Sequence, residues 1–324
     1  MNPTRLLDLF CEIVRIESPS RREAAMAARC ADELRGLGFS VRFDDSAAQT
    51  GADTGNLVAH LPGTAPGHVV LSAHMDTVQP CAGIEPVVED GVVRSAGDTI
   101  LSADDKAGIA EILTAVERVA AGDLPHGKLC IGFTPDEEIG EGPLHFDVAD
   151  FGADYAYTLD GGGAGEIEFQ NFNAATATFE LRGRSVHPGS AKDVMINAQK
   201  VAFELDSLLP QDEVPEKTER FQGFYHLVHT SGSVGNARLV YLLRDHDAAS
   251  FEARKRRMRE AAETLNAKYG AGTVVLTIKD QYRNMEKIIR QHPFLIEIAE
   301  DAVRSAGIEP VIVPIRGGTD GATL

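Results

Sequence analysis

Hydrophobic and polar residues alternate along this chain in two ways, and the two patterns predict helices and strands. Residues 3–36 place apolar side chains at helical spacing, with a break at the sequence IESPS, residues 16–20. Residues 102–122 predict another helix, with acids in its first turn. Short apolar runs that end in turn signals or acids predict strands at 39–45, 56–63, 68–76, 128–138 and 154–162.

The order of these elements predicts the fold class. Strands that alternate with helices indicate an α/β sheet with helices on both faces. The strand at 68–76, with the sequence HVVLSAHMD, is a continuous apolar run, as expected for a strand that is covered on both sides.

The pattern changes near Phe169 and predicts a second module. It consists of exposed-type strands that alternate with amphipathic helices in the order β-α-β-α-β, over 173–189, 195–210, 237–247, 250–270 and 272–282. A helix at 286–307 and a strand with a Gly-rich turn at 309–324 then follow. We therefore predict one domain formed by 1–169 and 284–324, with an α+β domain inserted at 170–283.

Composition supports this division and excludes some functions. A chain of 324 residues fits about two domains at ~100–200 residues each. The formal net charge of −18 would repel a phosphate backbone, which argues against nucleic-acid binding. The sequence contains no apolar run of about 18 residues and no signal-peptide pattern, so we expect no membrane span and a cytoplasmic location. Four widely spaced cysteines predict neither disulfides nor a thiolate metal cluster.

Acidic and imidazole side chains recur where the predicted strands end. His74 and Asp76 follow one strand, Glu137 and Glu138 follow another, and Asp160 follows a third. The carboxyl ends of strands in an open α/β sheet face one crevice, where ligands bind. Asp104, at the start of the helix 102–122, belongs to the loops of the same edge. These residues are therefore predicted to converge.

Each of these residues also has an ordinary structural interpretation, for example a hydrogen-bonded histidine, a solvated turn or a helix cap. Together they favour a metal site, because crowded carboxylates without a cation would repel each other and take up protons. Oxygen and imidazole ligands without thiolate suit zinc, manganese or cobalt. Two such ions bridged by a carboxylate would form a hydrolytic centre.

Seven segments occur in an order that resembles the M20 metallopeptidase family, most closely its tripeptide aminopeptidase (peptidase T) branch. They are HMDTV, SADDKAGIAEI, TPDEEIGEG, YTLDGG, SVHPGSAKDVMINA, LLRDHD and RGGTDGATL. The resemblance covers nearly the whole chain. It implies a catalytic domain with a mixed sheet and two zinc ions, an inserted lid or dimerisation domain, and a homodimer.

The resemblance also implies roles for individual residues. His74 and Asp160 would bind one metal ion, Glu138 the other, and Asp104 would bridge both. Glu137 would act as the general base on a water that bridges the metals. Asp76 would orient the His74 ring.

Four further residues would contact the substrate. His187 would polarise the scissile carbonyl, and Arg316 would pair with the terminal carboxylate of the peptide. Asn236 and Arg244 are weaker candidates. Arg244 has the alternative of a structural ion pair with Asp245 or Asp247.

The sequence departs from the family pattern at its C-terminal end. Members continue past GTDGATL to a histidine that completes the coordination of the second metal, whereas this sequence stops at Leu324. We therefore expect a weakened second site, and either a fragment of a longer product or a naturally short chain.

The predicted function is metal-dependent hydrolysis of short peptides by a tripeptide aminopeptidase. The alternatives are another M20 activity, namely a dipeptidase, carboxypeptidase or N-acyl amino-acid deacylase, or a non-catalytic remnant that binds peptides or dimerises.

Overall fold

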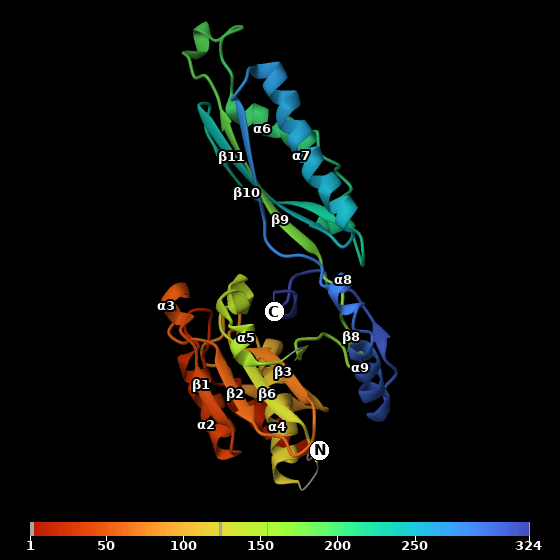
Figure 1. The fold of residues 1–324 in the computed structure, drawn as a ribbon. Helices are drawn as coiled ribbons and strands as arrows, with labels where there is room; N and C mark the ends of the chain where they lie inside the picture. Colours follow the sequence, from red (N-terminus) through yellow and green to blue (C-terminus); the bar gives the residue numbers. More distant parts are fainter. Residues whose placement is uncertain (1–2, 123–124, 154, 324) are drawn as a thin grey trace. The chain divides into compact units, whose positions relative to one another are not determined.

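The computed structural model describes residues 3–122, 125–153 and 155–323 (Figure 1). The chain divides into two compact units. Unit 1 consists of Met1–Gly162 with Thr319–Leu324, and unit 2 consists of Gly163–Gly318. Each unit has its own sheet and its own hydrophobic core.

Unit 1 contains a five-stranded mixed sheet in the order β1-β2-β6-β3-β7. Strand β2 runs antiparallel to both of its neighbours, β1 and β6, whereas β3 runs parallel to both β6 and β7. The strands are β1 (Ser40–Phe43), β2 (Leu57–Leu61), β3 (His68–His74), β6 (Lys128–Thr134) and β7 (Tyr157–Thr158). The predicted mixed α/β sheet and the strands predicted to form it are confirmed. Because β3, β6 and β7 are parallel, their carboxyl ends lie at the same edge of the sheet.

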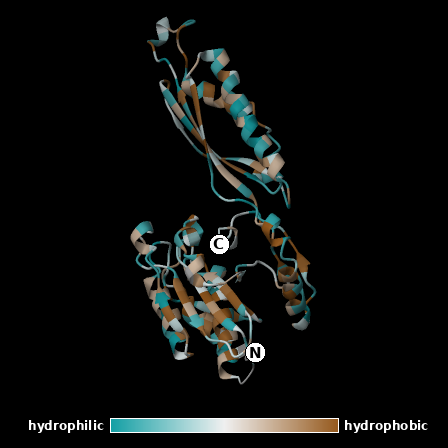
Figure 2. Cartoon of the chain, viewed as in Figure 1, coloured by the Kyte–Doolittle hydropathy of each residue, from teal (hydrophilic) through white to brown (hydrophobic). Residues whose placement is uncertain are grey.

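Helices and apolar loops cover both faces of this sheet. One face packs against α1 (Pro3–Ile13), α2 (Ala24–Gly36) and α4 (Ala103–Ala121) through a cluster of buried side chains. The other face packs against a smaller cluster that includes α5 (Val148–Phe151). In Figure 2 the inner strands are mostly coloured as hydrophobic. The apolar run of β3 thus results from burial on both sides.

Several short elements complete unit 1. They are α3 (Ala47–Thr50), the hairpin β4 (Pro86–Glu89) and β5 (Val92–Ser95), and the 3-10 turns η1 (Glu137–Ile139), η2 (Gly142–His145) and η5 (Asp320–Ala322). The sequence pattern did not predict the β4–β5 hairpin, whose valines are mostly exposed.

Unit 2 is built on a four-stranded antiparallel sheet in the order β10-β11-β9-β12. The strands are β9 (Asn173–Arg182), β10 (Phe224–Gly232), β11 (Asn236–Asp245) and β12 (Val274–Asp280). Helices α6 (Ala198–Ser207) and α7 (Ala248–Tyr269) pack on this sheet and enclose its core. The predicted β-α-β-α-β elements are present, and β10 is an additional edge strand.

The rest of unit 2 contains α8 (Glu286–Ile289), α9 (Phe294–Ser305) and the parallel pair β8 (Glu166–Ile167) and β13 (Val311–Ile312), with 3-10 turns η3 (Pro188–Ser190) and η4 (Pro215–Lys217). The single helix expected at 286–307 is wrong, because the helix is interrupted before Phe294. Pro293 lies at this interruption as the N-cap of α9, and proline has no backbone N–H to continue a helix.

Residues 284–318 lie in unit 2. Their predicted assignment to the same domain as 1–169 stays a prediction. No helix within the described residues is long and apolar enough to cross a bilayer.

Candidate metal centre

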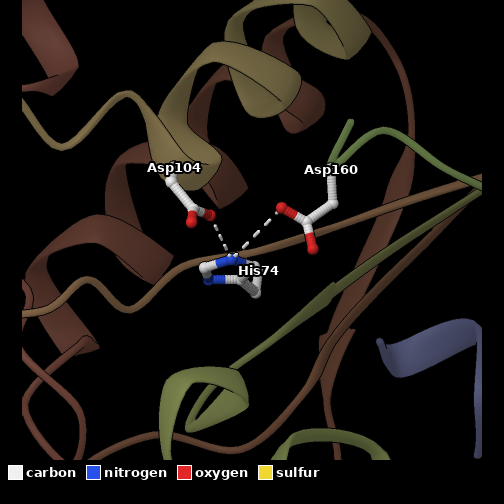
Figure 3. Close-up of side chains that lie close together, drawn as sticks. All are labelled: His74, Asp104 and Asp160. Carbon is white, nitrogen blue, oxygen red and sulfur yellow. Dashed lines mark hydrogen bonds and ion pairs between the residues drawn. The ribbon is translucent and has the colours of Figure 1, made fainter. Parts of the chain in front are cut away.

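Three side chains from separate segments of unit 1 converge at the carboxyl edge of the sheet (Figure 3). His74 Nε2 lies 2.9 Å from Asp104 Oδ1 and 3.7 Å from Asp160 Oδ1. One potential ligand atom from each residue lies within 4.8 Å of the other two. These three residues are among the four predicted metal ligands.

The local fold explains why these side chains meet. His74 is the last residue of β3, and Asp160 follows the parallel strand β7 by two residues. Asp104 is the second residue of α4, but its backbone is not yet helical there. Its carboxyl group therefore lies at the start of the helix, and the side chain is exposed, whereas the imidazole of His74 is buried.

Asp76 is fully buried and accepts hydrogen bonds from several directions. Its Oδ1 lies 3.2 Å from His74 Nδ1, which also lies 3.0 Å from the Asp76 carbonyl oxygen. Asp76 also accepts from the hydroxyl of Ser20 at 2.7 Å and from the backbone N–H groups of Glu137 and Glu138 at 2.9 and 3.1 Å. Asp76 thus contacts both the histidine and the turn that carries the two glutamates. The contact with His74 is the one that an orienting carboxylate makes.

The electrostatics of the triad fit a cation. Burial alone would lower the pKa of His74, but contacts with Asp104 and Asp160 raise it well above its usual value. The two carboxylates thus favour a positive charge at this position. The residues offer one imidazole nitrogen and two carboxylate oxygens, a donor set that suits zinc and related divalent ions. The three residues therefore fit a metal ion.

Glu137 and Glu138 occupy the turn η1 beside this triad. Burial raises the pKa of Glu137 to about 8. Burial and then the charge of Asp104 raise the pKa of Glu138. Glu138 is not one of the three groups whose ligand atoms converge, so its predicted role as a ligand stays a prediction.

Sequence reasoning missed Asp105, which lies next to the triad in the sequence and contacts His74. The Asp105 carboxyl is buried and accepts from the backbone N–H groups of His74 and Gly108, each at 3.2 Å. Burial raises its pKa to about 9. The sequence ADDK showed both aspartates, but it gave no sign of which side chain turns inward.

The four predicted substrate residues all belong to unit 2. His187 is exposed at the start of η3, and its Nδ1 accepts from the Gly189 N–H at 3.1 Å. Asn236 is exposed at the start of β11 and accepts from the hydroxyl of Ser233 at 3.3 Å. Their roles stay predictions.

Arg244 and Arg316 make contacts within unit 2. Arg244 donates to the Leu243 carbonyl at 3.0 Å and lies over the Tyr282 ring, while Asp245 pairs with Arg254 at 2.7 Å. The alternative of an Arg244–Asp245 pair is therefore wrong. Asp247, the other partner considered, caps α7 instead by accepting from the Ser250 N–H.

Arg316 holds a loop of unit 2 through both terminal nitrogens of its guanidinium. It donates from Nη1 to the carbonyls of Arg220 and Gln222 at 2.8 and 2.9 Å, and from Nη2 to the hydroxyl of Thr218 at 2.9 Å. It also lies over the rings of Phe172 and Phe224.

A histidine and two carboxylates at the carboxyl edge of a mixed sheet provide a donor set for a divalent metal ion. Residues 70–324 match the model of Peptidase family M20/M25/M40. The chain is 45% identical to Peptidase T of Clostridium perfringens over 322 residues, which cover 98% of this chain and 79% of that protein.

Two solved structures are similar along the whole chain. The aminopeptidase PepT of Bacillus cereus has a TM-score of 0.88 at 29% identity, and a tripeptidase of Staphylococcus aureus has a TM-score of 0.89 at 26% identity. Both alignments cover 100% of this chain and 87% of the other. The chain belongs to peptidase family M20/M25/M40, and it is a metallopeptidase.

Proposed function

We propose that the protein is a zinc-dependent aminopeptidase that removes the N-terminal residue from tripeptides. The observation that carries this proposal is the convergence of His74, Asp104 and Asp160 beside a turn with two adjacent glutamates. The similarity to proteins called Peptidase T, PepT and tripeptidase supports the choice of substrate. We also propose that it acts as a homodimer in the cytoplasm.

Each residue at the edge of the sheet has a proposed task. His74, Asp104 and Asp160 would hold one zinc ion, and Asp104 and Glu138 would hold a second. Bound zinc supplies Lewis-acid polarisation of a carbonyl and makes water more acidic. Asp76 keeps His74 Nε2 directed at the two aspartates, since its carboxylate contacts Nδ1 on the other side of the ring.

Glu137 would accept a proton from the attacking water and return it to the amine that leaves. A general base works best when its pKa lies near the working pH. Burial raises the pKa of Glu137 to about 8, so this carboxyl group can both take up and release a proton near neutrality.

The proposed substrate contacts come from unit 2. Arg316 would bind the terminal carboxylate of the peptide. Its Nη1 and Nη2 atoms make three hydrogen bonds within unit 2, and a guanidinium has five N–H groups in all, so it can donate to a carboxylate as well. His187 would polarise the scissile carbonyl, and Asn236 and Arg244 would support the peptide.

The test is hydrolysis of a free tripeptide beside an N-acetylated amino acid, with zinc added to protein that has been stripped with chelator. We expect release of the N-terminal residue from the tripeptide and loss of this activity in Glu137→Gln. The control Glu89→Gln changes an exposed glutamate of β4 and should keep full activity. Cleavage of the acetylated compound alone would indicate a deacylase. Absence of zinc binding together with absence of turnover would refute the enzyme.

A further inference from the structure

The turn that carries the two glutamates is held by its backbone. Three consecutive N–H groups donate to two buried carboxyl groups. The N–H of Asp136 donates to Glu23 Oε1 at 3.1 Å. The N–H groups of Glu137 and Glu138 donate to the two oxygens of Asp76. Glu23 and Asp76 are both 0% exposed, so water does not compete for any of these three hydrogen bonds.

The segment before α2 fixes the same turn from a second side. The backbone N–H of Arg21 donates to Asp136 Oδ1 at 2.7 Å, and its guanidinium lies 3.4 Å from Asp136 Oδ2. The other end of this guanidinium donates to Glu141 at 2.6 Å. Arg21 therefore contacts Asp136, directly before the two glutamates, and Glu141, three residues after Glu138.

The backbone of both segments requires such support. Asp136 has φ 60° and Arg21 has φ 74°, in the left-handed region that residues with a side chain rarely adopt. Conformations of this kind cost on the order of 1–3 kcal/mol each and persist only where surrounding contacts fix them. The carboxylate of Glu23 links the two positions, since it accepts from the N–H groups of both Arg21 and Asp136, each at 3.1 Å.

We propose that Glu23 is a positioning residue for the metal site, which acts through the turn Asp136–Glu138. It fixes the backbone from which Glu137 and Glu138 project, and Arg21 fixes the same turn through the Asp136 side chain. This inference rests on the proposed roles of the two glutamates.

The substitution Glu23→Ala removes the acceptor of the Asp136 N–H, whereas Glu23→Gln keeps an acceptor oxygen at the same distance along the side chain. A matched control is Glu33→Ala. Glu33 is a partly buried glutamate of α2 that pairs with Arg5 and Arg29, and among the described residues it makes no hydrogen bond or ion pair with the turn.

Three measurements on the full chain separate positioning from general stability. Amide hydrogen exchange over residues 133–141 reports the turn itself and needs no metal. Zinc affinity, measured by competition with a chromophoric chelator, reports the donor set. The values of kcat and KM for a tripeptide report the reaction.

In Glu23→Ala we expect faster exchange in this peptide, and zinc affinity and kcat about 10- to 100-fold lower, as is usual when a partner behind a metal site is lost. KM should change little. Glu23→Gln should restore all of these values close to the wild type, and Glu33→Ala should leave them unchanged. If Glu23→Ala does not fold, Glu23→Asp draws the oxygens away from the Asp136 N–H and gives the same comparison.

Unchanged exchange over 133–141 in Glu23→Ala would overturn the inference, as would faster exchange with unchanged zinc affinity and kcat. A wild-type chain that binds no zinc and does not hydrolyse tripeptides would refute the proposed function and, with it, the role of Glu23 toward metal. In that case the exchange data would still show whether Glu23 holds the turn.

Discussion

Replacing Asp76 by asparagine should weaken metal binding and destabilise unit 1 at the same time. The carboxylate is fully buried, and its two oxygens face different donors. Oδ1 faces His74 Nδ1 and the Glu137 N–H, and Oδ2 faces Ser20 and the Glu138 N–H.

The size of each effect follows from these contacts. The asparagine oxygen can replace Oδ1, and its NH2 group then donates to the Ser20 hydroxyl. The Glu138 N–H faces this NH2 group and has no acceptor, which costs about 1–3 kcal/mol for a buried donor. Loss of the charge behind His74 should reduce zinc affinity about 10- to 100-fold.

Asp44 provides the control. It is a half-buried carboxylate of unit 1 that also accepts from two backbone N–H groups, those of Ser46 and Asn56, and from a hydroxyl. In Asp44→Asn the new NH2 group faces the side-chain NH2 group of Asn56. The side-chain oxygen of Asn56 has no hydrogen-bond partner among the described residues, so rotation of the Asn56 amide group lets this oxygen accept from the new NH2 group. We therefore expect a smaller loss of stability and no change in zinc affinity.

Urea denaturation without metal measures the stability of each variant, and chelator competition measures zinc affinity. The reasoning is refuted if Asp76→Asn binds zinc as tightly as the wild type. It is also refuted if Asp44→Asn reduces zinc affinity as much as Asp76→Asn does.

Three more predictions test the packing inside each unit. In Gly108→Ala the new Cβ would lie 2.0 Å from the backbone oxygen of Leu159, next to Asp160, so both stability and zinc affinity should fall. The control Gly36→Ala meets no atom within 4 Å. Urea denaturation should show that it raises stability by about 0.5–1 kcal/mol. Arg254→Met leaves the buried Asp245 without its ion-pair partner and should cost about 3–5 kcal/mol with unchanged zinc affinity; equal stability would contradict this. Burial raises the pKa of Cys30 to about 12, so mass spectrometry should find this thiol alkylated at pH 8 only after unfolding.

The sequence was most informative where periodicity and burial agree. The strand His68–His74 was predictable because a short, continuous apolar run is typical of a strand that is buried on both faces of a sheet. The strand Phe224–Gly232 was missed because it lies at a sheet edge and only Tyr225 is buried there. The helix predicted over 286–307 was split at Pro293, which shows that a proline outweighs helical spacing on both sides of it.

For the candidate site, a different factor limited what the sequence could predict. His74, Asp104 and Asp160 could be expected to meet because chain order and strand direction place them at one edge. The role of Glu23 depends on a hydrogen bond to a backbone N–H 113 residues away. Backbone donors carry no sequence signal, so a glutamate before a helix looks like an ordinary first-turn acid.

The acids at this edge of the sheet differ in what balances their charge. Asp76 is satisfied by two backbone N–H groups and the hydroxyl of Ser20, which neutralise part of its buried negative charge without any cation. Asp104 and Asp160 contact the His74 imidazole, and a protonated imidazole can balance only one of their two charges. A divalent ion would balance both and would leave His74 neutral. The same edge thus separates two kinds of carboxylate, those that hold the backbone and those that are left to bind metal.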